Sequence, residues 1–211
     1  MSAALEGLKW RYACKKFNPE KKVSNEDLEK ISESLRLTPS SYGLQLWHFF
    51  FVSNDELREK MLPHCWGQRQ VVDSSHVLVL ARKKIHTEGD IKKLVDFTES
   101  ERSLPEGTLN DYASFMKQNT LSLSESDSAN WMSKQLYIAL GNAMTVLGDL
   151  KIDSCPMEGF LPEKIDEILS LEEKGYKSVL LLPFGYRADD DQAKDYKTVR
   201  YPSEDIISYI N

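Results

Sequence analysis

Residues near both ends of this chain carry cations that are suited to binding an anion. Residues 11–15 (RYACK) place Arg11 and Lys15 four positions apart, and Arg200 lies near the other end. In a helix end or a turn, this spacing puts both side chains on one face. Arginine offers a bidentate fork of donors and lysine a compact charge, and both suit a phosphate group. A solvated basic face has the same pattern, so this cluster alone leaves both interpretations open.

A second segment of interest, PSSYGLQLWHF at residues 39–49, follows a predicted helix and precedes a predicted strand. Pro39 and Gly43 bracket a loop that carries hydroxyl and amide groups. Gln45 stands between apolar neighbours, which indicates a polar group held in an apolar wall and in need of a specific partner. An ordinary connection between a helix and a strand is the alternative.

The third segment, PMEGF at residues 156–160, follows a short predicted strand. Pro156 and Gly159 allow unusual backbone geometry, which can expose peptide N–H groups to a ligand. A tight turn before the next helix is the alternative. Taken with the cations, these segments predict one ligand that has a phosphate at one end and a flat, polar heteroaromatic ring at the other.

Composition restricts the class of protein. The chain has 211 residues and a net charge of −6, which disfavours nucleic acid as the main partner. Three cysteines without CxxC spacing fit a reducing cytoplasm better than a disulfide framework. The first residues lack the apolar stretch of a signal peptide, and no run approaches the ~18 apolar residues of a membrane span. We therefore expect a soluble, cytoplasmic protein.

Several familiar catalytic patterns are missing from the sequence. The ten glycines form neither GxGxxG nor a P-loop, and no GxSxG elbow occurs. The four histidines lack metal-ligand spacing with one another or with the cysteines, so no metal site is expected. Cys14 beside Lys15 could be a thiolate of lowered pKa, but a plain buried or semi-exposed cysteine is favoured.

Periodicity and turn residues predict helices and strands in one domain over residues 1–211. We expect strands at residues 47–53, 76–83 and 176–187, and a short one near 150–155. We expect helices at residues 2–13, 24–37, 55–62 and 128–150, a helical excursion at about 84–127, and a final strand or helix at 201–210. Residues 76–83 are apolar at nearly every position, which predicts burial on both faces. The longest helix is either a central core helix or a subunit interface, and the order of elements indicates an α+β or α/β fold.

Seven segments, in this order, resemble the nitroreductase family of FMN-dependent oxidoreductases, near its oxygen-insensitive nitroreductase and dihydropteridine reductase branch. They are RYACKKF, TPSSYGLQLWHFFFV, DSSHVLVLAR, WMSKQLYIALGNAMTVLGDL, PMEGF, EKGYKSVLLLPFGYR and KTVRYP. The resemblance implies an α+β fold whose central, mixed and mainly antiparallel sheet is surrounded by helices. It further implies an intertwined, obligate homodimer with two FMN sites at the interface, each lined by both subunits.

The resemblance also assigns roles to residues of this chain. Three groups of residues would bind FMN. The first would hold its phosphate and the pyrimidine side of its ring, and the second would come from the partner subunit. The third would lie over the ring, with the backbone N–H of Glu158 near the flavin N5. The first group is Arg11, Tyr12, Ala13, Lys15, Gln70, Lys197 and Arg200; the second is Pro39, Ser40, Ser41 and Gln45; the third is Pro156, Met157, Glu158 and Gly159. No side chain need act as acid or nucleophile, because the flavin carries the hydride.

The sequence departs from the family pattern at three places. Gly67 and Gln70 stand where many relatives have Asn and Lys, and Thr198 stands where a Lys precedes the arginine by two positions. Tyr12 and Ala13 replace the His and Ser of some relatives, which removes one hydroxyl donor. A Lys at position 70 would stabilise the anionic reduced flavin, so Gln70 predicts a lower flavin potential unless Lys15 compensates.

The resemblance implies an enzyme that passes hydride from NADH or NADPH through FMN to a small acceptor such as a nitroaromatic, a quinone or a pterin, by ping-pong turnover. One alternative is a flavoenzyme of the same fold with different chemistry, such as a flavin-degrading or dehalogenating member. A second alternative is a flavin-binding regulatory protein without turnover. The sequence contains no legible site for the 2′-phosphate that separates NADPH from NADH.

Overall fold

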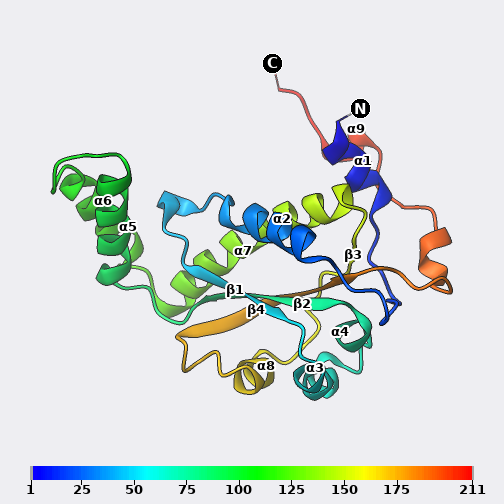
Figure 1. The fold of residues 1–211 in the computed structure, drawn as a ribbon. Coiled ribbons are helices and arrows are strands. Elements are labelled where there is room, and N and C mark those ends of the chain that lie inside the picture. The colour runs from blue at the N-terminus through cyan, green and yellow to red at the C-terminus, as the bar shows by residue number, and fades with distance from the viewer. Residues whose placement is uncertain (1, 211) are drawn as a thin grey trace.

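The computed structural model describes residues 2–210, and its centre is a four-stranded sheet (Figure 1). The strands lie in the order β1-β2-β4-β3, and each neighbouring pair is antiparallel. A parallel bridge between Ala13 and Ser154 extends the sheet beyond these strands. The sheet is thus mainly antiparallel, as predicted. The strands are β1 (Trp47–Val52), β2 (His76–Lys83), β3 (Asp153–Ser154) and β4 (Tyr176–Gly185).

Strand β2 runs through the middle of the core and is buried on both faces, as its apolar run predicted. Val77, Val79 and Ala81 belong to one hydrophobic cluster, whereas Leu78 and Leu80 belong to another. All five residues are fully buried. This division follows from the period of two in a strand, which sends successive side chains to opposite faces. The sheet therefore has a core on each side and must be covered by helices on both.

Two layers of helices supply this cover (Figure 1). The two longer helices lie over one face, and three short helices lie over the other. The first layer contains α2 (Asn25–Arg36) and α7 (Glu125–Asp149), and the second contains α3 (Asp55–Met61), α4 (Gln70–Asp73) and α8 (Pro162–Ile168). Helix α1 (Ala3–Trp10) packs against α7, and the one-turn helix α9 (Ser203–Ile206) lies near the end of the described residues.

Helix α2 begins where the sequence predicted. The Ser24 side chain accepts a hydrogen bond from the N–H of Asp27 at 3.1 Å, and its hydroxyl donates to the Asp27 carboxylate at 2.9 Å. These bonds satisfy one of the N–H groups that a helix leaves free at its start. Ile31 and Leu35 then face the core. The helix ends at Arg36, ahead of Pro39, which disfavours helical backbone before it.

Helix α7 uses two sides for different contacts. The buried side is centred on Leu136, Ala139 and Ala143, whereas Ile138 is 43% exposed. The other side borders the segment that follows α2, where the Asn142 amide donates to Thr38 Oγ1 at 2.9 Å. The half-exposed side keeps the alternative of a subunit interface open.

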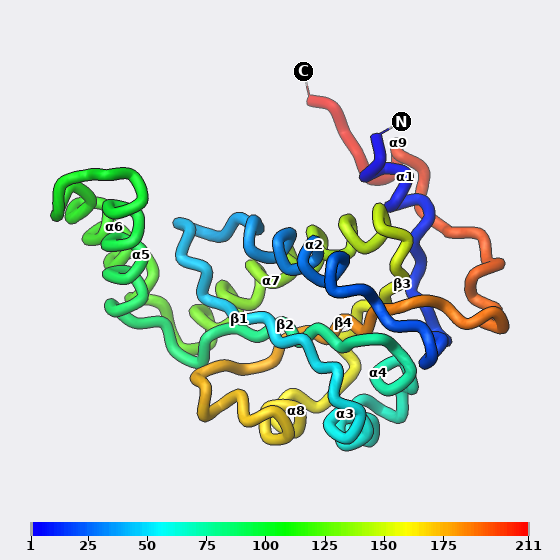
Figure 2. The backbone as a smooth tube through the Cα atoms, in the orientation of Figure 1, coloured from blue at the N-terminus to red at the C-terminus, as the bar shows by residue number. Residues whose placement is uncertain are grey.

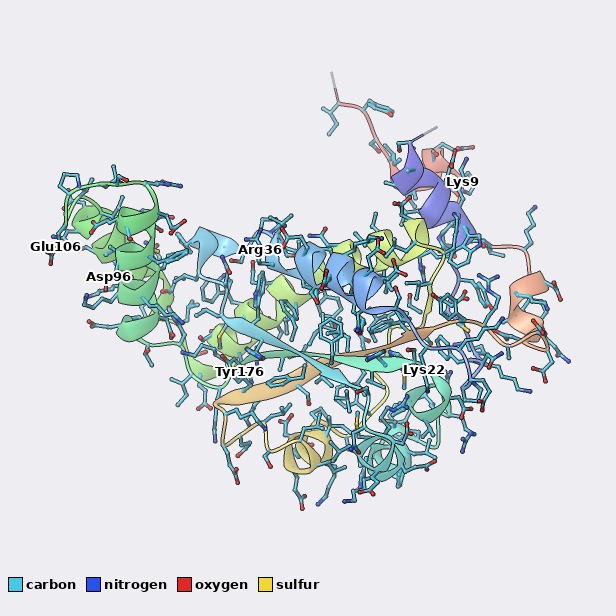
Figure 3. All side chains as sticks on the ribbon, in the orientation of Figure 1. Lys9, Lys22, Arg36, Asp96, Glu106 and Tyr176 are labelled. Carbon is cyan, nitrogen blue, oxygen red and sulfur yellow. The ribbon has the colours of Figure 1, made fainter. Side chains whose placement is uncertain are left out.

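The helical excursion after β2 forms two helices that project from the rest of the protein (Figure 2). They are α5 (Glu88–Glu101) and α6 (Asn110–Thr120). Asp96 and Glu106 lie at the far end of this excursion, on the opposite side of the molecule from Lys9 (Figure 3). Ile91 and Met116 join Leu44, Leu46 and other apolar residues in a third hydrophobic cluster. The excursion is thereby packed against the chain just before β1.

The contact between α1 and α7 depends on two glycines. A Cβ on Gly148 would lie 2.9 Å from the carbonyl oxygen of Gly7, which is closer than packed atoms tolerate. We expect Gly148→Ala to lower the free energy of unfolding by ~1–3 kcal/mol, as measured by urea denaturation. Gly141→Ala in the same helix is the control, because nothing lies within 4 Å of its Cβ. It should raise stability by up to ~1 kcal/mol. Equal stability of the two variants would contradict this account.

Candidate active site

Residues 11–15 leave helix α1 and run along the edge of the sheet. The predicted helix over residues 2–13 is wrong at its end, because Arg11 adopts extended backbone with φ −73° and ψ 145°. Ala13 bridges to Ser154, and the N–H of Cys14 donates to the Ser154 carbonyl at 3.2 Å. The basic segment thus lies beside β3 and, through it, beside the PMEGF segment.

Three of the predicted binding residues converge on Cys155, which is buried. Lys15 Nζ lies 4.0 Å from the Cys155 sulfur, and the Gln70 side chain is close enough to the same thiol to lower its pKa. Burial raises the pKa of the Cys155 thiol, against the opposing charges of Lys15 and Arg11. Cys155 is therefore a neutral thiol at the centre of a group of cations and amide donors. Gln70 is itself only 8% exposed, so its amide faces this group rather than solvent.

Arg11 carries a donor without a partner. Its Nε is buried and makes no hydrogen bond within residues 2–210. Burial lowers the pKa of Arg11, and the nearby charge of Arg200 lowers it further. A phosphate placed between the two guanidinium groups would pair with both and relieve their repulsion. The donor set at this position therefore fits the phosphate that the sequence predicted.

The PMEGF segment presents a free peptide N–H. Met157 exchanges both backbone hydrogen bonds with Leu181, at 2.8 and 3.1 Å. The next residue, Glu158, is exposed, and its N–H has no acceptor in the part of the chain that the structure describes. A ligand atom can therefore accept from this N–H, as the sequence predicted for the segment.

Aromatic side chains flank this N–H. A Cβ on Gly159 would lie 2.6 Å from the Trp66 ring, so only glycine lets the ring pack against this backbone. Gln68 supports the contact by donating to the Gly159 carbonyl at 2.9 Å. Trp66 remains 70% exposed. The Tyr137 hydroxyl of α7 donates to the Glu158 carboxylate.

Residues 39–45 do not join this group within one chain. They lie at the end of the sheet nearest the excursion, whereas residues 11–15 lie at the opposite end (Figure 1). The N–H of Ser41 donates to Gln135 Oε1 at 2.9 Å, and Ser40 Oγ accepts from the N–H of Gln45 at 3.0 Å. These contacts fix the segment against α7. The structure therefore separates two sets of predicted binding residues.

The interpretation of Gln45 as a polar group in an apolar wall is wrong for this chain. Leu44 and Leu46 turn into the third hydrophobic cluster, and Gln45, with a φ of 48°, points outward and is exposed. Tyr42 also has a positive φ, of 57°, which closes the turn before it. Gln45 can still meet a partner, but only one that lies outside this protomer.

The remaining cations differ in their freedom. Lys16 forms an ion pair with Asp190 on the surface, so it is not a free member of the basic cluster. Lys197 and Arg200 are exposed in the segment that precedes α9. Arg200 donates to the neighbouring carbonyl of Val199 at 2.6 Å.

Sequence reasoning missed the residues that support the site. No role was assigned to Cys155 from the sequence. Its position directly before PMEGF is the one signal in the sequence that could have identified it. The partner of Tyr12 also went unnoticed: the carboxylate of Asp191 accepts from its hydroxyl at 2.7 Å. Cys14 was correctly favoured as a plain buried cysteine, and burial raises its pKa to about 12.

Residues 2–210 contain neither a metal-binding cluster nor a helix that could span a membrane. No group of three or more His, Cys, Asp or Glu side chains is placed to hold a metal ion. No helix is both long enough and apolar enough to cross a membrane.

This sheet, its two helical layers and the cation group at its edge define a nitroreductase-type protein. The sequence profile of the nitroreductase family matches residues 8–186, so the chain belongs to this family. Two relatives share the name "Putative NAD(P)H nitroreductase": SERP2086 of Staphylococcus epidermidis and YfkO of Bacillus subtilis. They are 40% and 41% identical to this chain, and each alignment covers 98% of it and 96% of the relative.

Solved structures share the fold at lower identity. A nitroreductase-type protein from Exiguobacterium sibiricum 255-15, crystallised in complex with FMN, has a TM-score of 0.81 and 23% identity over 100% of this chain and 98% of its own. The enone reductase CLA-ER, from gut-bacterial fatty acid metabolism, has a TM-score of 0.80 and 18% identity over 99% and 98%. At these identities the comparison establishes the architecture alone.

Proposed function

We propose that this protein is an FMN-containing oxidoreductase that takes reducing equivalents from NADH or NADPH and passes them to a small acceptor by ping-pong turnover. Nitroaromatic, quinone and pterin-type acceptors are the proposed classes. Family membership and the relatives named as NAD(P)H nitroreductases support this reading. The observation that carries it is the convergence of Arg11, Lys15 and Gln70 on Cys155, three residues before the free N–H of Glu158.

The residues fit the two ends of FMN. Arg11 and Arg200 would hold the phosphate, with Lys15 and Lys197 adding positive charge, and Gln70 would donate to the ring. When bound, FMN supplies the hydride chemistry. The chain orients the ring through the Glu158 N–H and shields one face of it with the backbone of residues 156–159. No side chain is required as a nucleophile in this scheme.

Trp66 and Tyr137 support a flat, aromatic acceptor. Trp66 packs against Gly159 and Tyr137 bonds to Glu158, and both are substantially exposed, at 70% and 47%. An aromatic ring entering here could stack on Trp66, because offset stacking favours aromatic pairs. Burial of the reactants between such rings would also exclude water from the site.

We further propose that the active form is a homodimer in which residues 39–45 of one subunit complete the site of the other. Within one chain this segment lies far from residues 11–15 (Figure 1). Pro39 and Gln45 are exposed and Ser40 and Ser41 are half-buried, so this segment lies at the surface. The C-terminal segment also exposes large apolar side chains, namely Val199, Tyr201, Ile206, Tyr209 and Ile210. Such exposure in a soluble chain is typical of a surface that a partner covers.

We also propose that residues 1–211 form a single domain of a cytoplasmic protein.

The proposal is tested with purified protein and both nucleotides. We expect a yellow protein whose melting temperature rises with added FMN, because a ligand that binds only the folded state stabilises it. Anaerobic NADH or NADPH should bleach the flavin absorbance in stopped-flow mixing, and a nitroaromatic or quinone should restore it.

The alternatives predict different results. A flavin-binding regulatory protein would be yellow but would resist bleaching by both nucleotides. A colourless protein whose melting temperature FMN does not raise would contradict the cofactor itself. Reoxidation only by a halogenated substrate or by flavin consumption would favour a different flavoenzyme of the same fold.

A further inference from the structure

Asp191 is a buried carboxylate that lies outside the predicted binding residues but contacts the segment that contains several of them. It is 3% exposed and precedes the short helix η3 (Gln192–Asp195). Its Oδ2 accepts from three donors of residues 12–15: the hydroxyl of Tyr12 at 2.7 Å, the N–H of Lys15 at 3.2 Å and the thiol of Cys14 at 3.5 Å. One oxygen atom therefore accepts hydrogen bonds from three of the four residues 12–15.

The carboxylate is ionised in the folded protein. Burial alone would raise the pKa of Asp191, but the hydrogen bonds from Tyr12, Ala193, Lys15 and Cys14 together hold this pKa below its ordinary value. The Tyr12 hydroxyl stays protonated, because its burial and its bond to Asp191 raise the pKa of Tyr12. Hydrogen bonds to an ionised acceptor are stronger than neutral ones. Asp191 is thus a firm attachment point at neutral pH.

The ring of Tyr12 is held as well as its hydroxyl. The Arg187 guanidinium lies over it at 4.6 Å, and over the Trp10 ring at 4.5 Å. Arg187 is fixed in turn by buried Asp153. The Asp153 carboxylate accepts from the side-chain Nε of Arg187 at 2.9 Å and from the backbone N–H of Arg187 at 2.9 Å. Both the ring and the hydroxyl of Tyr12 are therefore held, which also constrains the backbone on either side of it.

Asp191 also anchors the second basic segment. Its other oxygen, Oδ1, accepts from the N–H of Ala193 at 3.1 Å and so caps helix η3. The chain leaves η3 directly into residues 197–200, where Arg200 comes close enough to Arg11 to lower its pKa. A single carboxylate is thus bonded to the segment that contains Arg11 and Lys15 and to the start of the segment that contains Arg200.

We propose that Asp191 is a positioning residue for the phosphate-binding cations: it holds the two basic segments in one geometry, so that they meet the FMN phosphate without rearrangement. The inference rests on the proposed FMN site. Preorganised donors bind more tightly, because the cost of ordering them is met during folding. A purely electrostatic role would have the opposite sign, since a carboxylate near an anion site weakens anion binding.

Titration of FMN into apoprotein, followed by flavin fluorescence, separates these roles. We expect Asp191→Asn to raise the Kd for FMN by ~10- to 100-fold, because a charged hydrogen-bond acceptor for several donors is lost. The matched control is Asp190→Asn, which removes the same charge one residue away. Asp190 is exposed and pairs with exposed Lys16, so its replacement should change the Kd by less than about threefold.

A double-mutant cycle adds a readout that general destabilisation would not move. If Asp191 acts through Tyr12, its replacement should cost several-fold less affinity in a Tyr12→Phe background than in wild type. Additive effects on the Kd, or a Kd for Asp191→Asn equal to or below that of wild type, would overturn the inference.

Two further measurements distinguish a folding defect in Asp191→Asn from a loss of FMN binding. Should Asp191→Asn show no cooperative unfolding transition, Tyr12→Phe alone decides, since it removes one bond to the same carboxylate. We expect its Kd to rise by ~2- to 12-fold, and an unchanged Kd would overturn the inference. Failure of wild-type protein to bind FMN would instead contradict the proposed function, whereas wild-type binding with an unaffected Asp191→Asn contradicts only the role of Asp191.

Discussion

Replacing Arg11 with methionine is expected to weaken FMN binding by ~10- to 100-fold and to leave the apoprotein at least as stable as wild type. The loss follows from one charged hydrogen-bond donor to phosphate, which contributes about 1.5–3 kcal/mol. The stability change has the opposite sign because Arg11 has a buried Nε without a partner and is repelled by Arg200. Removing the unpaired donor should raise the free energy of unfolding of the apo form by ~1 kcal/mol, while methionine keeps the apolar stem.

Two measurements on the same protein check this result: the Kd from fluorescence titration, and urea denaturation without FMN. Lys16→Met is the control, because it removes a charge from the same segment but from an exposed side chain that already pairs with Asp190. Its Kd should stay within about threefold of wild type. A variant Arg11→Met that binds FMN normally, or whose apo form is clearly destabilised, would show that Arg11 holds the fold rather than the phosphate.

Gln70→Lys is expected to raise the midpoint potential of the bound flavin by ~30–60 mV. The Gln70 amide is buried beside Cys155, Lys15 and Arg11, so a charge introduced there is poorly screened. A cation beside the proposed ring stabilises the reduced, more negative form. For a two-electron couple, 30 mV corresponds to about 1.4 kcal/mol.

Substitutions of Gln70 that introduce a negative charge or no charge serve as controls. Gln70→Glu should lower the potential by a similar amount, and Gln70→Met should change it little. An anaerobic redox titration of each holoprotein, with a reference dye, measures all three. Equal potentials for wild type and Gln70→Lys, or shifts of the same sign for Lys and Glu, would contradict the placement of Gln70 near the reducible ring.

The elements with strong local signals could be predicted from sequence. Strand β2 was recognised because nearly every position is apolar, and α2 because Ser24 supplies its N-cap and Asp27 follows three residues later. The end of α1 was not predicted, because residues 11–13 have acceptable helix propensity. Their extended backbone is set instead by the bridge from Ala13 to Ser154, which is far away in sequence. Local preference yields to such long-range pairing.

The candidate site residues that the sequence singled out are cations and glycines, whereas the residues that support them gave no signal. Arg11 and Lys15 stand out by charge and spacing, and Gly159 by the backbone freedom it gives. Asp191, in contrast, is one of three successive aspartates, and nothing in the sequence separates the buried one from its exposed neighbours. Gln45 was misread because its apolar neighbours gave no sign that its φ is positive. Only the folded chain decides which side chain turns inward.

The distance between residues 11–15 and residues 39–45 also determines how damage would be distributed in the proposed dimer. Each chain contributes its basic segment to one site and its hydroxyl-bearing segment to the other. A single chain with a defect in either segment therefore harms only one of two sites. When two defects are carried by different chains, one at residues 11–15 and one at residues 39–45, both fall into the same site. The remaining site is then built wholly from intact segments, so two individually inactive homodimers can yield a half-active mixed dimer.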